Sequence, residues 1–323
     1  MLDQYGRVIN YLRISVTDRC NLRCCYCMPE GVQDVGMKNI LTFEEIWEIV
    51  RTGVSLGITH IRITGGEPLV RKGCVDLIRG IREIPGVETI TMTTNGVLLG
   101  NYAKQLKEVG VDSVNISLDT LDPEEFYKIT GKRELQEVLA GIRAAKTAGL
   151  QVKLNAVNRK ELDPLPLVRY AQKENLPLRF IEMMPVGYGK KYVGRSNEEL
   201  RKTLATVCGN PECITDREEL SRMGSGPAVY YRFSDLKVPV GFISAIHGKF
   251  CDTCNRIRLT AEGYLKLCLC YDKGADLRRA LREGEKENLR TIMEETIFRK
   301  PAAHCFEHPE EMTETHEMVK IGG

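Results

Sequence analysis

The chain has 323 residues, of which 42% are hydrophobic and 28% charged, and this excludes a small disulfide-stabilised peptide and an extended disordered chain. Its 46 basic and 44 acidic residues leave a net charge of +2, so no strong overall field would attract nucleic acid or anionic lipid. The start lacks the apolar core of a signal peptide, and no run of 18 apolar residues occurs. We therefore expect a cytoplasmic protein with neither a nucleic acid nor a membrane as partner.

Six segments rich in β-branched residues alternate with helical patterns in the first half of the chain. The segment 42–56 is one such helical pattern, and it begins with the capping pair Thr42 and Glu45. Six strand–helix units in succession predict a parallel sheet, and the lack of GxGxxG after the first strand argues against a dinucleotide-binding fold. We expect an incomplete (β/α)6 barrel of the TIM type. The predicted strands cover residues 11–17, 60–64, 89–94, 113–118, 151–157 and 178–183.

These predicted strands are apolar on one face and polar on the other. Alternate residues of a strand point to opposite faces, so Ile61, Ile63, Val114 and Ile116 would face the helices. A closed eight-stranded barrel fills its interior with branched apolar side chains, whereas here the interior would be polar and cationic. We therefore expect an open interior that holds a polar ligand. The inward set is Arg13, Ser15, Thr17, Arg62, Thr64, Thr91, Thr93, Asn115, Ser117, Lys153 and Asn155.

The pattern changes after about residue 185. A helix is predicted from the N-cap Ser196 to about residue 207, followed by a loop over 208–213. Short antiparallel strands are predicted within 223–233, 238–246 and 255–269, and the last 20 residues look irregular. We expect two domains, 1–215 and 216–323, with the second as an α+β extension that closes the open side of the barrel.

Cysteines are unusually numerous, with twelve in the chain, and in a reducing compartment they indicate metal or redox chemistry. Cys20, Cys24 and Cys27 form CxxxCxxC directly after the first predicted strand. Three thiolates can hold three irons of a 4Fe-4S cube and leave the fourth iron open. A structural zinc normally takes four ligands, so zinc or plain thiols are the less favoured alternative. Cys25 is interpreted as a bystander.

A second cysteine group follows 230 residues later in the chain. Cys251, Cys254 and Cys268 form CxxC, thirteen residues and a third cysteine, and Cys270 is close enough to compete for the last place. Together the four also fit a zinc ribbon, so spacing alone leaves iron–sulfur and zinc open. Other residues with metal-like spacing are expected to be buried or free: Cys208, Cys213, Cys305, His304 and His308.

The N-terminal motifs resemble the radical S-adenosylmethionine superfamily. The resemblance is carried by CxxxCxxC with an aromatic residue, Tyr26, before its last cysteine, and by GGEP at residues 65–68 after the second strand. It implies that the amino and carboxylate groups of S-adenosylmethionine chelate the open iron of the first cluster. It also implies cofactor contacts from Tyr26, Gly66, Ser117 and Met184. For Ser117 and Met184 the alternative is packing at strand ends.

The C-terminal motifs extend the resemblance to essentially the whole chain. CxxCNRIRLT from Cys251, GPAVYY at 226–231 and the terminal Gly-Gly are similar to the molybdenum cofactor biosynthesis protein A family, the GTP 3',8-cyclases. The resemblance implies a second 4Fe-4S cluster on Cys251, Cys254 and Cys268, with its open iron at the guanine of GTP. It gives catalytic roles to Arg256, Arg258, Gly322 and Gly323. For the Gly-Gly tail the alternative is an unstructured terminus.

A triphosphate needs cations, and the predicted inward faces supply them. Arginine suits phosphate because of its planar fork, while lysine acts as a point charge. Arg256 and Arg258 would share one face of a strand beside the second cysteine group, and each inward arginine has an ordinary ion pair as its alternative. The full set of GTP contacts implied is Arg13, Arg62, Thr93, Lys153, Arg179, Arg256, Ile257 and Arg258.

The resemblance implies a lyase that works by radical chemistry. An electron on the first cluster would cleave S-adenosylmethionine, and the 5'-deoxyadenosyl radical would take hydrogen from C3' of GTP, giving 3',8-cyclo-7,8-dihydro-GTP for molybdenum cofactor synthesis. The implied partners are a flavodoxin- or ferredoxin-type electron donor and a downstream cyclic pyranopterin monophosphate synthase. The oligomeric state is open, with a homodimer as one option. Two rivals remain, a peptide or sulfatase maturase with auxiliary clusters and a non-catalytic zinc protein.

Overall fold

A single curved sheet organises the molecule in the computed structural model, which describes residues 1–31, 35–192, 194–224, 226–283 and 288–322. Its first six strands follow chain order and pair in parallel, which confirms the predicted incomplete barrel. They are β1 (Tyr11–Ser15), β2 (His60–Thr64), β3 (Thr89–Thr94), β4 (Ser113–Ser117), β5 (Gln151–Asn158) and β6 (Leu178–Glu182).

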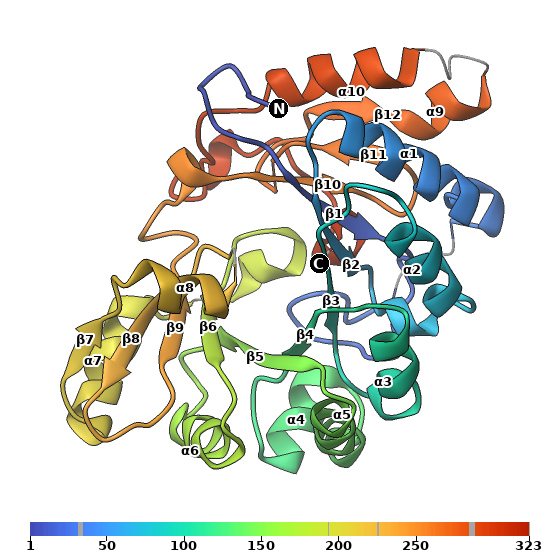
Figure 1. The fold of residues 1–323 in the computed structure, drawn as a ribbon. Coiled ribbons are helices and arrows are strands. Elements are labelled where there is room, and N and C mark those ends of the chain that lie inside the picture. Colours follow the sequence, from blue (N-terminus) through green and yellow to red (C-terminus); the bar gives the residue numbers. More distant parts are fainter. Residues whose placement is uncertain (32–34, 193, 225, 284–287, 323) are drawn as a thin grey trace.

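Helices follow these strands and lie along the outer side of the sheet (Figure 1). The first begins as predicted, because the Thr42 hydroxyl accepts from the Glu45 amide while the Glu45 carboxylate accepts from the Thr42 amide. The barrel helices are α1 (Phe43–Ser55), α2 (Cys74–Arg82), α3 (Leu99–Glu108), α4 (Pro123–Thr130), α5 (Leu135–Thr147) and α6 (Leu165–Glu174).

The main core lies between the sheet and these helices. Ile63, Val114 and Ile116 are fully buried there, as the alternation of the strands predicts, together with Leu77 of α2 and Ile142 of α5. Alternate residues of a strand point to opposite faces of the sheet. Because the apolar residues face the helices, the polar residues of neighbouring strands face the hollow of the barrel.

The C-terminal region adds strands to both edges of the six-stranded sheet. β10 (Arg256–Leu259) pairs in parallel with β1, and β9 (Val240–Ile243) pairs in parallel with β6. The expectation of only antiparallel strands there was wrong for these two, because they satisfy the open edges of β1 and β6. The outer strands β11 (Tyr264–Lys266), β12 (Gly274–Asp276) and β8 (Val229–Phe233) are antiparallel, as is β7 (Pro211–Cys213), where a loop was expected. The sheet does not close, since β12 and β7 end it.

The remaining helices cover the ends of this extension. α7 (Asn197–Cys208) begins at the predicted N-cap, Ser196, which forms a capping box with Glu199. The others are α8 (Arg217–Met223), α9 (Leu277–Arg282) and α10 (Leu289–Phe298). Short 3-10 helices are η1 (Met37–Asn39), η2 (Pro68–Val70), η3 (Gly187–Lys191), η4 (Cys251–Thr253), η6 (Pro309–Glu311) and η7 (Met318–Ile321).

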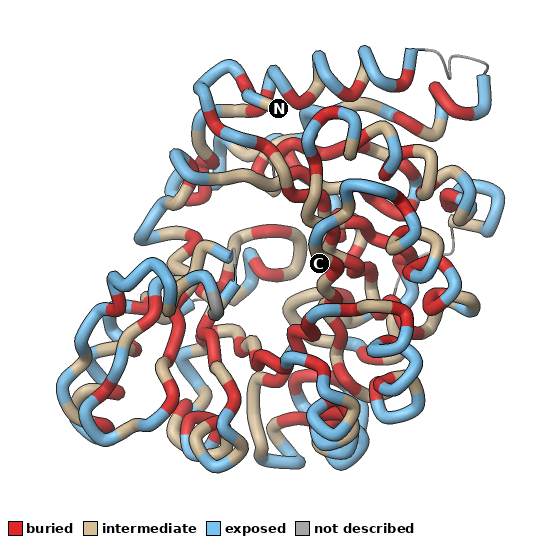
Figure 2. The backbone as a smooth tube through the Cα atoms, viewed as in Figure 1, coloured by how far each residue is buried: buried red, intermediate tan, exposed pale blue. Residues whose placement is uncertain are grey.

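The C-terminal segment runs into the middle of the molecule. Figure 2 shows this end of the chain among buried segments, and Val319 and Ile321 of η7 are at most 2% exposed. Among the helices built from described residues, none has the length and apolar character needed to cross a membrane.

Candidate active site

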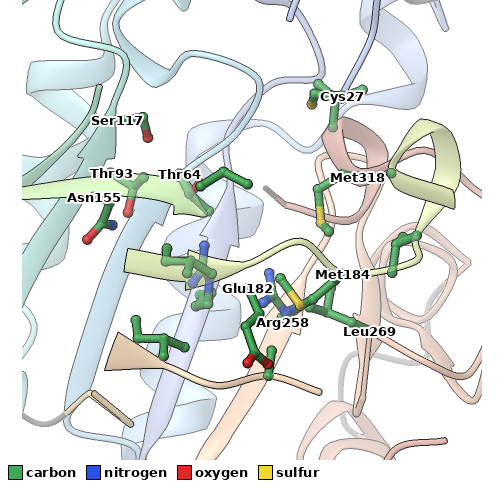
Figure 3. Close-up of a pocket in the computed structure, with 18 of the residues that line it drawn as sticks. Cys27, Thr64, Thr93, Ser117, Asn155, Glu182, Met184, Arg258, Leu269 and Met318 are labelled. Atoms are coloured by element: carbon green, nitrogen blue, oxygen red, sulfur yellow. The ribbon is translucent and has the colours of Figure 1, made fainter. Parts of the chain in front are cut away.

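One cavity of about 390 Å³ occupies the hollow of the barrel, and both cysteine groups line it. The cysteines that face it are Cys20, Cys24, Cys27, Cys251, Cys254 and Cys268. Figure 3 shows Thr64, Thr93, Ser117 and Asn155 from neighbouring barrel strands on its wall, with Cys27 and Met318 at another side. The sequence alone could not establish that residues 230 positions apart share one space, and the structure brings them together.

The first cysteine group lies on the loop between β1 and α1. The loop is tied to α4 because the Cys25 amide donates to the carbonyl of Ile129. Burial raises the pKa of Cys27 to about 12, and the sulfur of Cys20 adds to this shift. Burial also raises the pKa of Cys24 well above its usual value, again with help from neighbouring sulfurs. Three partly exposed thiols that line one cavity fit a cationic metal centre, which stabilises the thiolate form.

Cys25, between two of these cysteines, does not line the cavity. Its sulfur instead accepts from Nη1 of Arg159 at 3.6 Å. The position of Cys25 agrees with its interpretation as a bystander.

The GGEP turn packs against the first cysteine loop. A Cβ on Gly66 would lie 2.3 Å from the carbonyl oxygen of Arg19, so only glycine allows this approach. Glu67 is fully buried and accepts from the amides of Leu69 and Asn95. Burial raises the pKa of Glu67 to about 7 despite these hydrogen bonds. The turn is therefore held against the loop by backbone contact and by one buried carboxyl group.

The hydroxyl of Tyr26 is held by a carboxyl group just after the end of β4. It donates to Oδ2 of Asp119 at 2.8 Å, and Oδ1 of Asp119 accepts from the amide of Val157 at 2.8 Å. Both Tyr26 and Asp119 line the cavity, as do Gly66, Ser117 and Met184. All four positions expected to contact S-adenosylmethionine therefore face the same space.

In the second cysteine group, Cys251 begins η4, Cys254 directly follows η4, and Cys268 lies in the turn after β11. The amide of His304 donates to Sγ of Cys251 at 3.4 Å, and Nη1 of Arg7 donates to the carbonyl of Cys251 at 2.9 Å. Burial raises the pKa of Cys251. Burial alone would also raise the pKa of Cys254, but the charges of Lys300 and Arg256 outweigh it and lower that pKa. The environment therefore favours the thiolate of Cys254, the form that binds metal, and disfavours that of Cys251.

Cys268 faces the cavity and Cys270 does not. Cys270 is fully buried, with its sulfur 2.7 Å from that of Cys305. The sequence left open whether Cys268 or Cys270 is the third ligand of this group. The geometry favours Cys268.

A row of arginines crosses the sheet beside the second cysteine group. Register places Arg13 of β1 opposite Arg62 of β2 on one side and Arg258 of β10 on the other. Burial and then Arg256 lower the pKa of Arg258 to about 10. Burial and then Arg258 and Arg62 lower the pKa of Arg13 well below its usual value. Such crowding of like charge is relieved by a polyanion.

Two expected nucleotide contacts do not line the cavity. The ammonium of Lys153 donates to the carbonyl of Met223 at 2.8 Å, just behind the wall. Ile257 is fully buried in the core on the opposite face of β10, because its parity differs from that of Arg256 and Arg258. A contact from Ile257 would have to come from its main chain. The other expected contacts, Arg13, Arg62, Thr93, Arg179, Arg256 and Arg258, line the cavity.

The tail reaches the arginine row. The carbonyl oxygen of Gly322 accepts from Nη2 of Arg13, Nη1 of Arg258 and Oγ1 of Thr64, each at 3.3 Å. Gly322 has a φ of 87°, which favours glycine. The alternative of a loose terminus is therefore wrong for Gly322, whereas Gly323 lies outside the described residues.

Among the cavity-lining residues that sequence reasoning missed are the polar residues Asp119, Asn95 and Lys300. Asp119 continues the polar parity of β4 two positions after Ser117, so the alternation pattern contained the signal. Asn95 directly follows β3, where parallel strands place ligand-binding residues. Lys300 had no local signal, because only the fold brings the end of α10 to the second cysteine group.

The other metal-like spacings do not form a site. Cys208 is buried and Cys213 exposed. Among all described residues, one group of His, Cys, Asp or Glu side chains has its ligand atoms within 4.8 Å of one another, and its members, His308, Glu310 and Glu311, are all exposed. Neither cysteine triad is that compact in this structure.

Comparison with known families gives matches over nearly the whole chain. Residues 14–162 match the model described as "Radical SAM superfamily", and residues 176–306 match "Molybdenum Cofactor Synthesis C". A protein of Clostridium perfringens strain SM101 named GTP 3',8-cyclase is 43% identical, with 100% of both chains covered. A Peptoclostridium acidaminophilum protein of the same name is 45% identical, with 100% of this chain and 98% of the relative covered.

Solved structures share the fold. Streptococcus suis SuiB bound to S-adenosylmethionine superposes with a TM-score of 0.67 at 14% identity, covering 97% of this chain and 77% of that one. Native anSMEcpe with bound AdoMet superposes with a TM-score of 0.60 at 18% identity, covering 92% of this chain and 82% of that one. At these identities the likeness is one of fold alone.

Proposed function

The chain belongs to the GTP 3',8-cyclase family of the radical S-adenosylmethionine superfamily, and from this premise we propose which of its residues carry the reaction. It is an enzyme of molybdenum cofactor biosynthesis that converts GTP to 3',8-cyclo-7,8-dihydro-GTP. The two rivals, a maturase and a structural zinc protein, are thereby set aside. The observation that carries the assignment of residues is that two cysteine triads and a row of arginines line one cavity.

Cys20, Cys24 and Cys27 would hold a 4Fe-4S cluster that takes S-adenosylmethionine. When bound, the two groups would supply the radical chemistry needed at C3' of GTP. The chain's own contribution is to hold the cofactor: Tyr26, Gly66, Ser117 and Met184 surround it, and Asp119 fixes the ring of Tyr26. Burial of this end of the cavity keeps water from a reactive carbon centre.

Cys251, Cys254 and Cys268 would hold a second 4Fe-4S cluster, which would serve to bind the guanine. The donor set supports this, since three cysteines line the cavity while Cys270 is turned away. Lys300 and Arg256 place positive charge beside Cys254 and so stabilise its thiolate. Three protein ligands leave one coordination position for substrate.

Arg13, Arg62, Arg179, Arg256 and Arg258 bind the triphosphate and ribose of GTP, with Thr93 as a hydroxyl contact and Lys153 as an added charge behind the wall. Planar guanidinium groups can hold phosphate oxygens in pairs, which fixes the nucleotide against the reacting carbon. Arg256 and Arg258 and the tail residues Gly322 and Gly323 serve as the catalytic set. The carbonyl of Gly322 keeps Arg13 and Arg258 oriented through its two hydrogen bonds.

Several finer assignments remain proposals that rest on the sequence. They are a cytoplasmic location, a flavodoxin- or ferredoxin-type electron donor, and a downstream cyclic pyranopterin monophosphate synthase. Two further proposals of this kind are a homodimer and a domain boundary at residue 215. The near-neutral net charge of +2 supports the absence of a nucleic-acid partner.

The test is an anaerobic assay of the reconstituted chain with S-adenosylmethionine, a strong reductant and one nucleoside triphosphate at a time. We expect about eight irons per chain, as two four-iron clusters require, and a cyclised product from GTP only. About four irons per chain would overturn the second cluster. Failure to consume GTP with both clusters loaded would overturn the assignment of the arginines to the nucleotide.

A further inference from the structure

Two cysteines outside the cavity lie in contact with each other. Sγ of Cys270 is 2.7 Å from Sγ of Cys305, and the amide of Cys305 donates to Sγ of Cys270 at 3.1 Å. Cys270 is 0% exposed and Cys305 4% exposed. They pack in a small apolar cluster with Val186, Phe306 and Ile321, separate from the main core. Neither the iron centres nor the nucleotide site uses them.

The contact joins two segments that line the cavity with their neighbouring residues. Cys268 and Leu269 face the cavity on one segment, where Figure 3 labels Leu269, and His304 and Phe306 face it on the other. Cys270 and Cys305 face away from it. The pair therefore sits directly behind the second cysteine group.

We propose that Cys270 and Cys305 form a disulfide that fastens the C-terminal segment to the turn holding Cys268. The sulfurs need to approach by less than about 1 Å to reach the bonded distance of about 2.0 Å. The oxidant is a low-molecular-weight disulfide. Two S–H bonds break and one S–S bond forms, and the two electrons and two protons convert the oxidant to two thiols. This inference does not rest on the proposed function.

The cross-link would have a structural effect on the second cysteine group. Its Cys305 end adjoins His304, whose amide donates to Sγ of Cys251. Its Cys270 end is two residues from Cys268. One bond therefore fixes the positions of Cys251 and Cys268 relative to each other and keeps the extra thiol of Cys270 away from the metal.

The experiment uses the iron-loaded chain under anaerobic conditions. The chain is incubated with cystamine, quenched in acid, alkylated with N-ethylmaleimide in denaturant and digested with trypsin. We expect a cross-link between peptides 267–273 and 300–320, with iron content unchanged and Cys268 recovered alkylated. Fragment ions distinguish Cys270 from Cys268, which share a peptide. Reduction before alkylation should remove the cross-link.

Variants map the bond. Cys270→Ser and Cys305→Ser should each lose the cross-link, while Cys208→Ser, at another buried cysteine, should keep it. Recovery of both thiols alkylated at every cystamine concentration would overturn the proposal. A cross-link that forms only with loss of iron, or that joins Cys305 to Cys268, would overturn it as well. Because every readout is a mass or an iron count, a failed cyclase assay would leave the result unaffected.

Discussion

The carbonyl oxygen of Gly322 lies 3.3 Å from Nη1 of Arg258, so the last described residue of the chain contacts β10, the strand between Cys254 and Cys268. The same oxygen accepts from Arg13 of β1 at 3.3 Å. One main-chain acceptor thus connects two arginines on neighbouring strands. Neighbouring guanidinium groups repel each other, and a shared acceptor holds both in a fixed orientation before a polyanion binds.

Gly322→Ala tests this contact. The added Cβ would have ordinary contacts, 3.5 Å to Cβ of Ser15 and 3.8 Å to Cγ2 of Thr64, so the cost comes from the positive φ. That cost is about 1–2 kcal/mol for an L-residue. We expect the tail to leave its place in part and the ratio of cyclised product to 5'-deoxyadenosine to fall. Gly6→Ala is the control, since Gly6 has a φ of 76° with nothing within 4 Å. An unchanged ratio would remove the tail from the mechanism.

Arg256→Ala and Arg258→Ala test the nucleotide site. Both residues line the cavity next to the second cysteine group, and neither is one of the cysteines proposed to bind a cluster. We expect each variant to keep slow, uncoupled cleavage of S-adenosylmethionine while cyclised product is lost. Quantifying 5'-deoxyadenosine and product in one reaction checks this. The exposed Arg143→Ala variant is the control, and full product from both site variants would refute their assignment.

The affinity for GTP should depend on pH through Lys153. Burial, with the charges of Arg179 and Arg62, lowers the pKa of Lys153 to about 8. As pH rises through 8 the ammonium loses its proton, and attraction to the triphosphate weakens. Anaerobic titration calorimetry on both sides of pH 8 should show weaker binding at the higher pH. Lys153→Met should bind less tightly at low pH and lack this step, and a step that persists in the variant would assign it to another group.

Asp119→Asn should weaken cofactor binding without removing iron. The carboxylate of Asp119 accepts from the Tyr26 hydroxyl and from the Val157 amide, and an amide of the same shape cannot accept both in the same way. We expect a higher dissociation constant for S-adenosylmethionine by equilibrium dialysis, with iron content unchanged. The exposed Glu124→Gln variant is the control. Loss of iron in Asp119→Asn would show instead that Asp119 supports the cysteine loop.

The barrel could be predicted from the sequence because its signals are local. Alternation in the segment 60–64 marks both the core face and the cavity face, and the two capping boxes fix where helices begin. The cysteine spacings are local as well. Those patterns were sufficient for the order of the six strands and for most cavity residues.

What the sequence could not supply depends on long-range pairing. Nothing near residues 256–259 indicates that this strand joins the N-terminal β1, and the parallel pairing of β10 with β1 puts Arg258 beside Arg13. The CxxCNRIRLT motif led us to expect Ile257 at the nucleotide together with its two arginine neighbours. Because alternate strand residues point to opposite faces, the side chain of Ile257 is buried in the core instead. Lys153 has the predicted parity, yet it does not line the cavity, because its ammonium donates a hydrogen bond to the carbonyl of Met223 at the end of α8.

The buried ion pair of Lys266 and Glu314 should govern the stability of the C-terminal extension. Both side chains are at most 2% exposed, and Lys266 also donates to the carbonyl of Tyr271. Removing one partner of a buried pair leaves an unpaired charge and costs about 3–5 kcal/mol. We expect Glu314→Gln to lower the free energy of unfolding by about that amount, whereas Lys266→Met with Glu314→Leu should lose much less. Urea denaturation of the iron-loaded chain, followed by circular dichroism, measures both.

The same pair makes a prediction for acid. Burial alone would raise the pKa of Glu314, but the hydrogen bonds from Lys266 and the His316 amide outweigh it, so the pKa is lowered. A carboxyl group with a lowered pKa stabilises the fold above its unfolded value of about 4.3 and loses that contribution as pH falls through the folded pKa. The native chain should therefore lose stability toward acid more steeply than the double variant. Equal acid dependence in the two proteins would mean that the pKa of Glu314 is the same in the folded and unfolded chains, which would contradict its lowered value.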